Sequence, residues 1–218
     1  MRCIKFLLAI LPITISSPVL AATISDPVGD FLPSFVGVAS PDLDVTSFSV
    51  ALDPGATAFT LGAVLAGQVN PVNPGFYVIG VDTGAGAIKP FAAIGEPNVI
   101  FDQVIVVQKN GTATLGTNSL NVSMVGNEFI VNVPTSLLPS TGASLANYGF
   151  NIWPRFGSTV TNNSQISDFA PNNALLSING LIGAVPEPSS WLMMLLGFGL
   201  VGAALQFRRK EQRPMQVA

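Results

Sequence analysis

The middle of the chain is a succession of short segments in which apolar residues recur at every second position. Residues 48–52 and 59–65 both show this period of two, which is typical of a β-strand with one buried face. Residues 76–81 are apolar throughout and indicate a central strand buried on both faces. Since this part of the chain has no convincing amphipathic helical pattern, we predict an all-β domain of eight or nine strands, arranged as a single β-sandwich.

Gly, Pro and Asn residues separate these segments. Asn110 and Gly111 follow residues 99–107, which are rich in β-branched side chains, and an Asn-Gly pair tolerates the positive φ angles of a type I′ hairpin turn. A second hairpin is expected around Gly126 and Asn127. Further predictions are a short helical turn within residues 134–139 and late strands at 147–153 and 175–178.

The first 21 residues have the three parts of a secretory signal peptide. Arg2 and Lys5 form a basic start, an apolar run follows, and Val19-Leu20-Ala21 is a small-residue cleavage site. A retained membrane helix is the alternative, but Pro12 breaks the apolar run early. We therefore expect export by the Sec-type machinery and removal of residues 1–21.

The part of the chain that follows is acidic and has few basic residues. Ten Asp and Glu residues and three Lys and Arg residues lie between positions 22 and 184, which gives a net charge of −7. Nucleic-acid phosphates are bound by Lys and Arg, so this balance argues against a nucleic-acid partner. It suits an extracellular protein, and a surplus of carboxylates suits divalent cations.

The side chains that many hydrolases use are missing from the exported part. The sequence has no His, and its one Cys, Cys3, lies in the predicted signal peptide. Ser-His-Asp and Cys-His mechanisms, His-containing zinc sites and disulfides are therefore excluded there. A carboxylate pair of the glycosidase type stays open, although no acidic pair stands apart from the acids in loops. We expect that the protein is not an enzyme.

The end of the chain combines three features in a fixed order. Pro186 and Pro188 fix φ and hold Glu187 in an extended segment. Residues 191–207 carry no charge, and a helix of this length rises about 25 Å, close to the roughly 30 Å of a hydrocarbon core. Residues 208–210 are basic and hold the end in the cytoplasm by the positive-inside rule. We predict a C-terminal transmembrane helix; a permanent anchor is the alternative.

This order closely resembles the PEP-CTERM sorting signal of Gram-negative bacteria. The resemblance implies processing by exosortase, a membrane-embedded cysteine protease or transpeptidase, and proteins with this signal are often associated with exopolysaccharide and biofilm. It also implies that the inner membrane is a transit anchor and that the product ends at the cell surface or outside the cell. The implied recognition motif is Pro186, Glu187 and Pro188, and the implied cytoplasmic stop is Arg208, Arg209 and Lys210.

A weaker resemblance concerns the start of the exported domain. Asp26-Pro-Val-Gly-Asp30 and Pro41-Asp42-Leu-Asp44, with a later strand that ends in Asp82, are similar to the opening of DOMON-like modules related to family 9 carbohydrate-binding modules. That resemblance implies calcium near the opening loops, held by Asp26, Asp30, Asp42 and Asp44. On an extended segment Asp42 and Asp44 would point the same way. The alternative is that these residues cap turns.

Two late segments, 151–156 and 166–171, mix aromatic, Arg and Asp side chains. One interpretation makes them the rim of a ligand site in which Arg155 pairs with Asp168. The other places aromatic residues such as Trp153 in the core and Arg155 in a structural ion pair. We favour the second, because aromatic residues in strands usually pack inward. The domain then offers few exposed aromatic residues to a sugar.

Together these observations predict a secreted, exosortase-processed bacterial surface or extracellular-matrix protein, associated with exopolysaccharide or biofilm. The alternative is a carbohydrate-binding module that acts on exopolysaccharide. The predicted parts are a signal peptide (1–21), a β-sandwich (22–179), a linker (180–184), the sorting signal (185–210) and a cytoplasmic tail (211–218).

Overall fold

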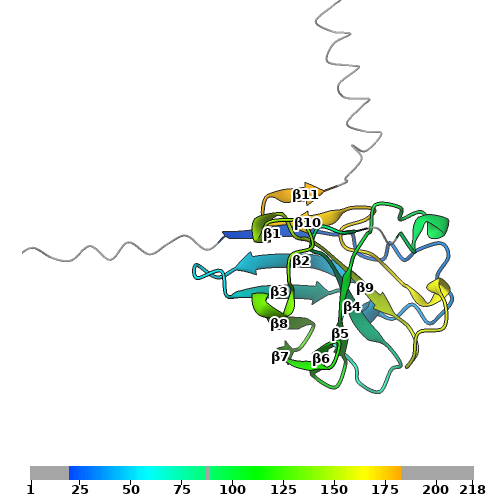
Figure 1. Cartoon of the computed structure of the whole chain (residues 1–218). Coiled ribbons are helices and arrows are strands. Elements are labelled where there is room, and N and C mark those ends of the chain that lie inside the picture. Colours follow the sequence, from blue (N-terminus) through cyan, green and yellow to red (C-terminus); the bar gives the residue numbers. More distant parts are fainter. Residues whose placement is uncertain (1–19, 87–88, 183–218) are drawn as a thin grey trace, which may run out of the picture.

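The computed structural model describes residues 20–86 and 89–182, and within them the chain is all-β, as predicted (Figure 1). These residues form eleven strands, five short 3-10 helices and no α-helix. The strands are β1 (Leu20–Ser25), β2 (Val45–Leu52), β3 (Ala58–Leu65), β4 (Phe76–Asp82), β5 (Gln103–Gln108), β6 (Thr112–Leu115), β7 (Asn118–Val125), β8 (Glu128–Pro134), β9 (Gly149–Arg155), β10 (Leu175–Ser177) and β11 (Gly180–Ile182). The 3-10 helices are η1 (Pro41–Leu43), η2 (Ala92–Ile94), η3 (Thr135–Leu137), η4 (Leu145–Asn147) and η5 (Asn163–Gln165).

All the strands belong to one antiparallel sheet that folds over into two layers. Its order is β1-β2-β3-β8-β7-β6-β5-β4-β9-β10-β11. The fold lies at β7, whose first half pairs with β6 (Leu120 opposite Ala113) and whose second half pairs with β8 (Asn121 opposite Asn132). Strand β1, at one end of this order, lies beside β10 near the other end (Figure 1). The layers of the predicted sandwich are therefore continuous with each other.

The main core lies between these two layers. Phe48, Val50 and Leu52 of β2 alternate inward, as do Phe59, Leu61 and Leu65 of β3. The opposite layer contributes Tyr77, Ile79 and Val81 of β4 with Phe150 and Ile152 of β9. Ring contacts connect the layers directly: the centroids of Phe59 and Phe150 are 5.0 Å apart, and those of Tyr77 and Phe129 are 4.9 Å apart. The period of two in the sequence corresponds to this inward face.

A second cluster covers the outer face of the β5-β4-β9 layer. Phe76 and Val78 of β4 point into it and pack with Trp153, Phe91 and Phe169. Every residue of β4 except Asp82 is buried as a result. The prediction of a central strand buried on both faces is confirmed, and the second cover comes from loops rather than from another sheet.

The two hairpin turns lie where the sequence predicts them, but one of them has a different turn type. The hairpin after β5 has three loop residues, because Gln108 pairs with Thr112. Only Gly111 in it has a positive φ, +82°, so the predicted type I′ turn is wrong, since that turn needs positive φ at two residues. The second hairpin turns through Gly126 and Asn127, as expected. The short helical turn predicted within 134–139 is η3.

Two strands lie where the sequence had no strand signal. β1 begins at Leu20, two residues before the predicted cleavage point, and β11 includes the first three residues of the predicted linker. The rest of the predicted signal peptide and the predicted transmembrane segment lie outside the described residues. Within the described residues, no helix is long and apolar enough to span a bilayer.

Candidate functional site

Three carboxylates from distant parts of the chain meet at one end of the two layers. Asp26 directly follows β1, Asp30 lies in the loop after it, and Asp168 lies in the segment that returns along β9. One carboxylate oxygen from each lies within 4.8 Å of the others. Asp168 is 1% exposed, and the other two side chains are half-buried. We call Asp26, Asp30 and Asp168 the acidic cluster.

Backbone hydrogen bonds hold the loop that carries Asp30 in place. Leu32 N donates to Ser167 O at 2.8 Å, and Val36 N donates to Ser164 O at 2.7 Å. Asp168 itself accepts from Val45 N at 2.9 Å through Oδ2 and from Phe169 N at 2.7 Å through Oδ1. The cluster therefore sits where the first loop is fixed to the late segment.

The cluster carries more buried acceptors than donors. Asp26 Oδ2 and Asp30 Oδ1 are buried and have no hydrogen-bond partner among the described residues. Burial, reinforced by the neighbouring carboxylates, raises the pKa of Asp26 to about 8. Burial also raises the pKa of Asp168 to about 7, against the two backbone hydrogen bonds that favour its ionised form. A positive ion would both accept these oxygens as ligands and compensate the repulsion among the ionised carboxylates.

Hard divalent cations prefer such groups. Calcium takes six to eight oxygen ligands from carboxylates, backbone carbonyls and water. The acidic cluster supplies three carboxylates, two of them half-buried, and backbone carbonyls and water would have to supply the remaining ligands. Binding would release the protons that burial otherwise retains on Asp26 and Asp168. The residues present thus fit a calcium ion.

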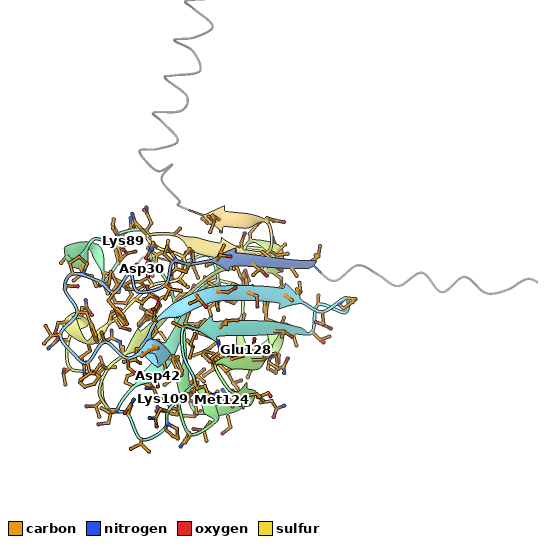
Figure 2. The ribbon with its side chains drawn as sticks, turned by 180° about the vertical axis from the view of Figure 1, so that it is seen from behind. Asp30, Asp42, Lys89, Lys109, Met124 and Glu128 are labelled. Atoms are coloured by element: carbon orange, nitrogen blue, oxygen red, sulfur yellow. The ribbon has the colours of Figure 1, made fainter. Side chains whose placement is uncertain are left out.

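Of the four aspartates predicted to hold calcium, the structure brings two into this cluster, Asp26 and Asp30. Asp44 lies close by: its Oδ2 accepts from Gly29 N at 2.7 Å, and its buried Oδ1 has no partner among the described residues. It is near enough for its charge to raise the pKa of Asp26. Asp42 is elsewhere, beside Lys109 and away from Asp30 (Figure 2).

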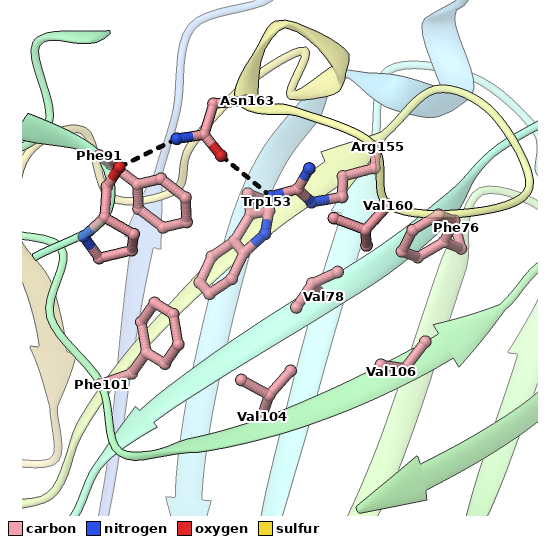
Figure 3. Close-up of a pocket in the computed structure, with 11 residues that line it drawn as sticks. Phe76, Val78, Phe91, Phe101, Val104, Val106, Trp153, Arg155, Val160 and Asn163 are labelled. Carbon is pink, nitrogen blue, oxygen red and sulfur yellow. Dashed lines mark hydrogen bonds between the residues drawn. The ribbon is translucent and has the colours of Figure 1, made fainter. Parts of the chain in front are cut away.

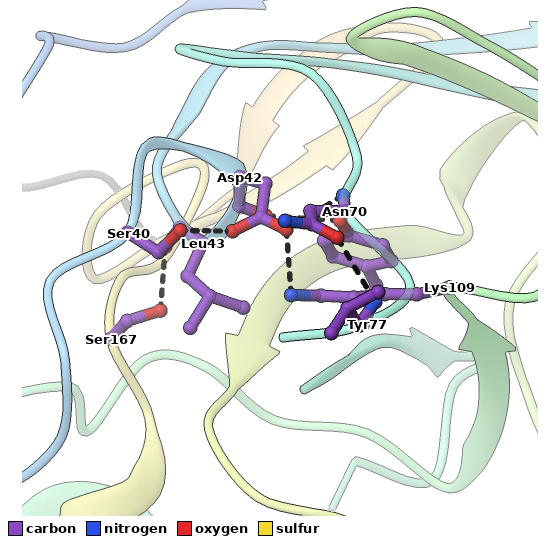
Figure 4. A network of polar contacts seen from close by, with 8 residues as sticks. Ser40, Asp42, Leu43, Asn70, Tyr77, Lys109 and Ser167 are labelled. Carbon is purple, nitrogen blue, oxygen red and sulfur yellow. Dashed lines mark hydrogen bonds and ion pairs between the residues drawn. The ribbon is translucent and has the colours of Figure 1, made fainter. Parts of the chain in front are cut away.

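Asp42 belongs to a buried network of its own (Figure 4). Lys109 Nζ lies 2.7 Å from Asp42 Oδ2, and the two side chains are 3% and 2% exposed. Asn70 N donates to the same oxygen at 3.0 Å, and Ser40 Oγ donates to Oδ1. Burial disfavours the carboxylate, but the hydrogen bonds from Lys109, Ser40 and Asn70 outweigh it, so the pKa of Asp42 lies below its usual value. This group has its counter-ion within the protein.

The expectation that Asp42 and Asp44 point the same way is wrong. It assumed an extended segment, whereas Pro41–Leu43 form the 3-10 helix η1, which turns Asp42 toward Lys109. Asp168 was absent from the predicted ligands, because it comes 142 positions after Asp26 and only the fold joins them. The favoured interpretation of the late segments is correct in placing Trp153 in the core, but the structural ion pair that it gave Arg155 is wrong, as is the alternative pair of Arg155 with Asp168. Arg155 donates to Asn162 O at 3.0 Å and forms no ion pair among the described residues.

The residues of the predicted sorting signal lie outside the described part of the chain. These are Pro186, Glu187 and Pro188 of the motif and Arg208, Arg209 and Lys210 of the basic stop. No curated protein and no solved structure matches the chain, so the resemblance of the exported domain to DOMON-like modules stays a prediction. Residues 184–210 do match a known family: the chain carries the PEP-CTERM protein-sorting motif.

Proposed function

We propose that the two-layered β domain is extracellular cargo, a structural module of the exopolysaccharide matrix that calcium stabilises at the acidic cluster. The sorting motif at residues 184–210 supports export, processing by exosortase and membrane anchoring before surface display. The association with exopolysaccharide or biofilm is proposed because other proteins that carry this motif are often associated with them. The role of the chain in the processing reaction is that of substrate.

Calcium stabilisation rests on the carboxylate oxygens of Asp26, Asp30 and Asp168, which lie within 4.8 Å of one another. Three carboxylates at this separation repel one another unless protons or a cation intervene. An extracellular medium can supply the cation. A bound ion would connect the end of β1 to the segment after β9 that carries Asp168. It would thereby join the first and the last parts of the domain.

A structural role fits the aromatic residues better than a sugar-binding role does. Among the described residues, no aromatic side chain is fully exposed, and Trp153 is 2% exposed. A sugar ring that stacks on a protein needs an open aromatic face. Phe31 and Phe35 are half-buried and stack on each other, with ring centroids 5.8 Å apart. This pair keeps the carbohydrate-binding module open as the alternative.

The sorting proposal is tested in the native host with a Glu187→Ala variant. We expect this variant to accumulate uncut in the inner membrane, because the motif that the processing enzyme reads is altered. The matched control is Glu211→Ala, which removes an acid from the predicted cytoplasmic tail. Normal release of the Glu187→Ala protein, with the same mature C-terminus by mass spectrometry, would overturn the proposal.

The calcium proposal is tested by the melting temperature of the released protein during a calcium titration at pH 7.5. At a concentration of 100 times Kd, calcium should add about 2.7 kcal/mol to the free energy of unfolding. Asp30→Asn should remove most of this gain, and Glu128→Gln, an exposed acid on β8, should leave it unchanged. An unchanged melting temperature at millimolar calcium would refute calcium binding.

The alternative is tested by pull-down of the released protein with purified exopolysaccharide. Binding that disappears in a folded Phe35→Ala variant supports a carbohydrate-binding module. Binding that needs calcium but tolerates Phe35→Ala supports the matrix proposal. Absence of binding with and without calcium contradicts both forms of exopolysaccharide association.

A further inference from the structure

A pocket of about 220 Å³ opens on the outer face of the β5-β4-β9 layer, and no residue of the acidic cluster lines it (Figure 3). Its floor consists of apolar side chains from β4 and β5, with Phe91 and Phe101 on one side. Trp153 and Arg155, both on β9, and Asn163 supply its polar groups. A cavity of roughly 150 Å³ can hold a benzene ring, so this pocket has room for a ring and a short substituent.

The indole of Trp153 is fixed in place and has an unused donor. Gly80 lies next to it on β4, where a Cβ atom would come within 2.7 Å of the indole ring. Phe91 and Phe101 pack around the indole, with ring centroids 5.0 and 5.2 Å from it. Trp153 Nε1 is buried and has no partner among the described residues. In Figure 3 this nitrogen faces Val78 and Val160, which line the pocket.

Arg155 adds a positive charge without a matching carboxylate. Its side chain is buried, and its two acceptors are neutral: Asn162 O at 3.0 Å and Asn163 Oδ1 at 3.5 Å. No carboxylate in the described part of the chain forms an ion pair with it. Burial accordingly lowers the pKa of the guanidinium. A guanidinium has five N–H donors, so it can serve a further acceptor.

We propose that this pocket binds a small aryl carboxylate, with its ring on the apolar floor and its carboxylate on Arg155 and Trp153 Nε1. Both polar groups are donors, and one of them is charged. The third polar side chain, Asn163, already has a partner on each side of its amide, because its Nδ2 donates to Pro90 O at 2.9 Å and its Oδ1 accepts from Arg155. The inference is independent of the calcium site and of the sorting motif.

Two other ligand classes fit less well. A sugar would bring several hydroxyl groups into a pocket whose polar side chains offer donors and few free acceptors, and each unpaired hydroxyl costs binding free energy. A plain hydrocarbon would leave Trp153 Nε1 unpaired and Arg155 without a counter-charge. An aryl carboxylate satisfies both donors and fills the apolar part.

The test uses phenylacetate as the probe and the full-length chain in lipid nanodiscs, with empty nanodiscs as the blank. Isothermal titration calorimetry should detect saturable binding of phenylacetate. Its neutral analogue, phenylacetamide, should bind about tenfold more weakly, because a hydrogen bond to a charged group contributes more than one to a neutral group. Equal affinity for the two compounds would overturn the role of the carboxylate.

Two matched variants locate the site. Val160→Trp should block the pocket and reduce the affinity for phenylacetate at least about tenfold, the effect of losing roughly 1.4 kcal/mol. Val160 is 64% exposed, so the change should leave the fold intact, which the melting temperature checks. Val36→Trp changes a similarly exposed valine, 71% exposed, that does not line the pocket, and it should not affect binding. Undiminished binding to Val160→Trp, or no binding of phenylacetate to the wild type at millimolar concentration, would refute the proposal.

Discussion

The first loop of the domain contributes to two groups of aspartates whose negative charges are compensated in different ways. Asp42 is paired with Lys109 at 2.7 Å, and its pKa is lowered. Asp26 and Asp168 face other carboxylates, and their pKa values are raised to about 8 and about 7. The charge of Asp42 is compensated within the protein, whereas the acidic cluster needs bound protons or a cation.

This difference shows that the tertiary structure, and not the position in the sequence, decides whether an aspartate faces a basic side chain or other carboxylates. Asp42 and Asp44 are two residues apart, yet the η1 turn directs Asp42 to Lys109 while Asp44 accepts from Gly29 N beside the acidic cluster. A buried pair depends on its partner inside the protein. A buried cluster of like charge responds to the solution, through pH and cations.

The largest effect is expected from breaking the completed pair. Lys109→Met leaves the Asp42 charge buried without its partner, which should lower the free energy of unfolding by about 3–5 kcal/mol. Urea denaturation followed by circular dichroism measures this change. The double variant Asp42→Asn with Lys109→Met should recover much of the loss. If Lys109→Met alone costs no more than a surface substitution, the pair does not stabilise the fold.

The second prediction removes one charge from the acidic cluster. Without calcium at pH 8, Asp26→Asn should raise the melting temperature by a few degrees, because it relieves repulsion among the remaining carboxylates; 1 kcal/mol corresponds to about 2–4 °C at this size. With calcium the order should reverse, since the wild type alone has all three carboxylates for the ion. A variant that is less stable than the wild type under both conditions would contradict the repulsive character of the cluster.

The pH dependence should have opposite signs in the two regions. Asp26 and Asp168 have folded-state pKa values above the unfolded value, so their contribution to stability is complete below about pH 4 and is lost as the pH rises toward 7 and 8. Asp42 has a lowered pKa, so its contribution is present above about pH 4 and is lost as the pH falls. In the presence of a chelator, the melting temperature should therefore peak near pH 4 and decline from there toward pH 8.

Saturating calcium should flatten the decline between pH 5 and 8, because the ion takes the place of the bound protons. A melting temperature that rises steadily from pH 5 to 8 in the chelator would show that the cluster is not destabilised by ionisation. The same series on Asp26→Asn should show a shallower decline, which assigns the effect to the cluster.

The smallest effect is expected at an acid that belongs to neither region. Glu128 is exposed on β8, and Glu128→Gln should change the free energy of unfolding by less than about 0.5 kcal/mol. It should also leave the calcium response and the pH profile as they are in the wild type. A calcium response that weakens in this variant would mean that calcium acts through the net charge of the surface and not through the acidic cluster.

The sequence predicted much of the fold and part of the cluster. The alternation of Phe59 and Leu61 with small residues identified an inward face, and Asp26 and Asp30 were identified as candidate ligands. Strand β1 was not predicted, because it begins at the presumed cleavage site, where a pattern of small residues indicates processing. Asp168 was not predicted as a ligand, because it lies 142 positions after Asp26 and a single acid between Ser167 and Phe169 gives no sign of a partner so far away in the chain.

Residue order alone determined the all-β class, the absence of His and Cys chemistry from the exported domain, and the sorting motif, since each depends on composition or on a contiguous run of residues. The tertiary structure alone decided which aspartates share a site and that, among the described residues, neither Arg155 has a carboxylate partner nor the Trp153 N–H an acceptor. These features depend on contacts between strands far apart in the sequence, and such contacts leave no local pattern.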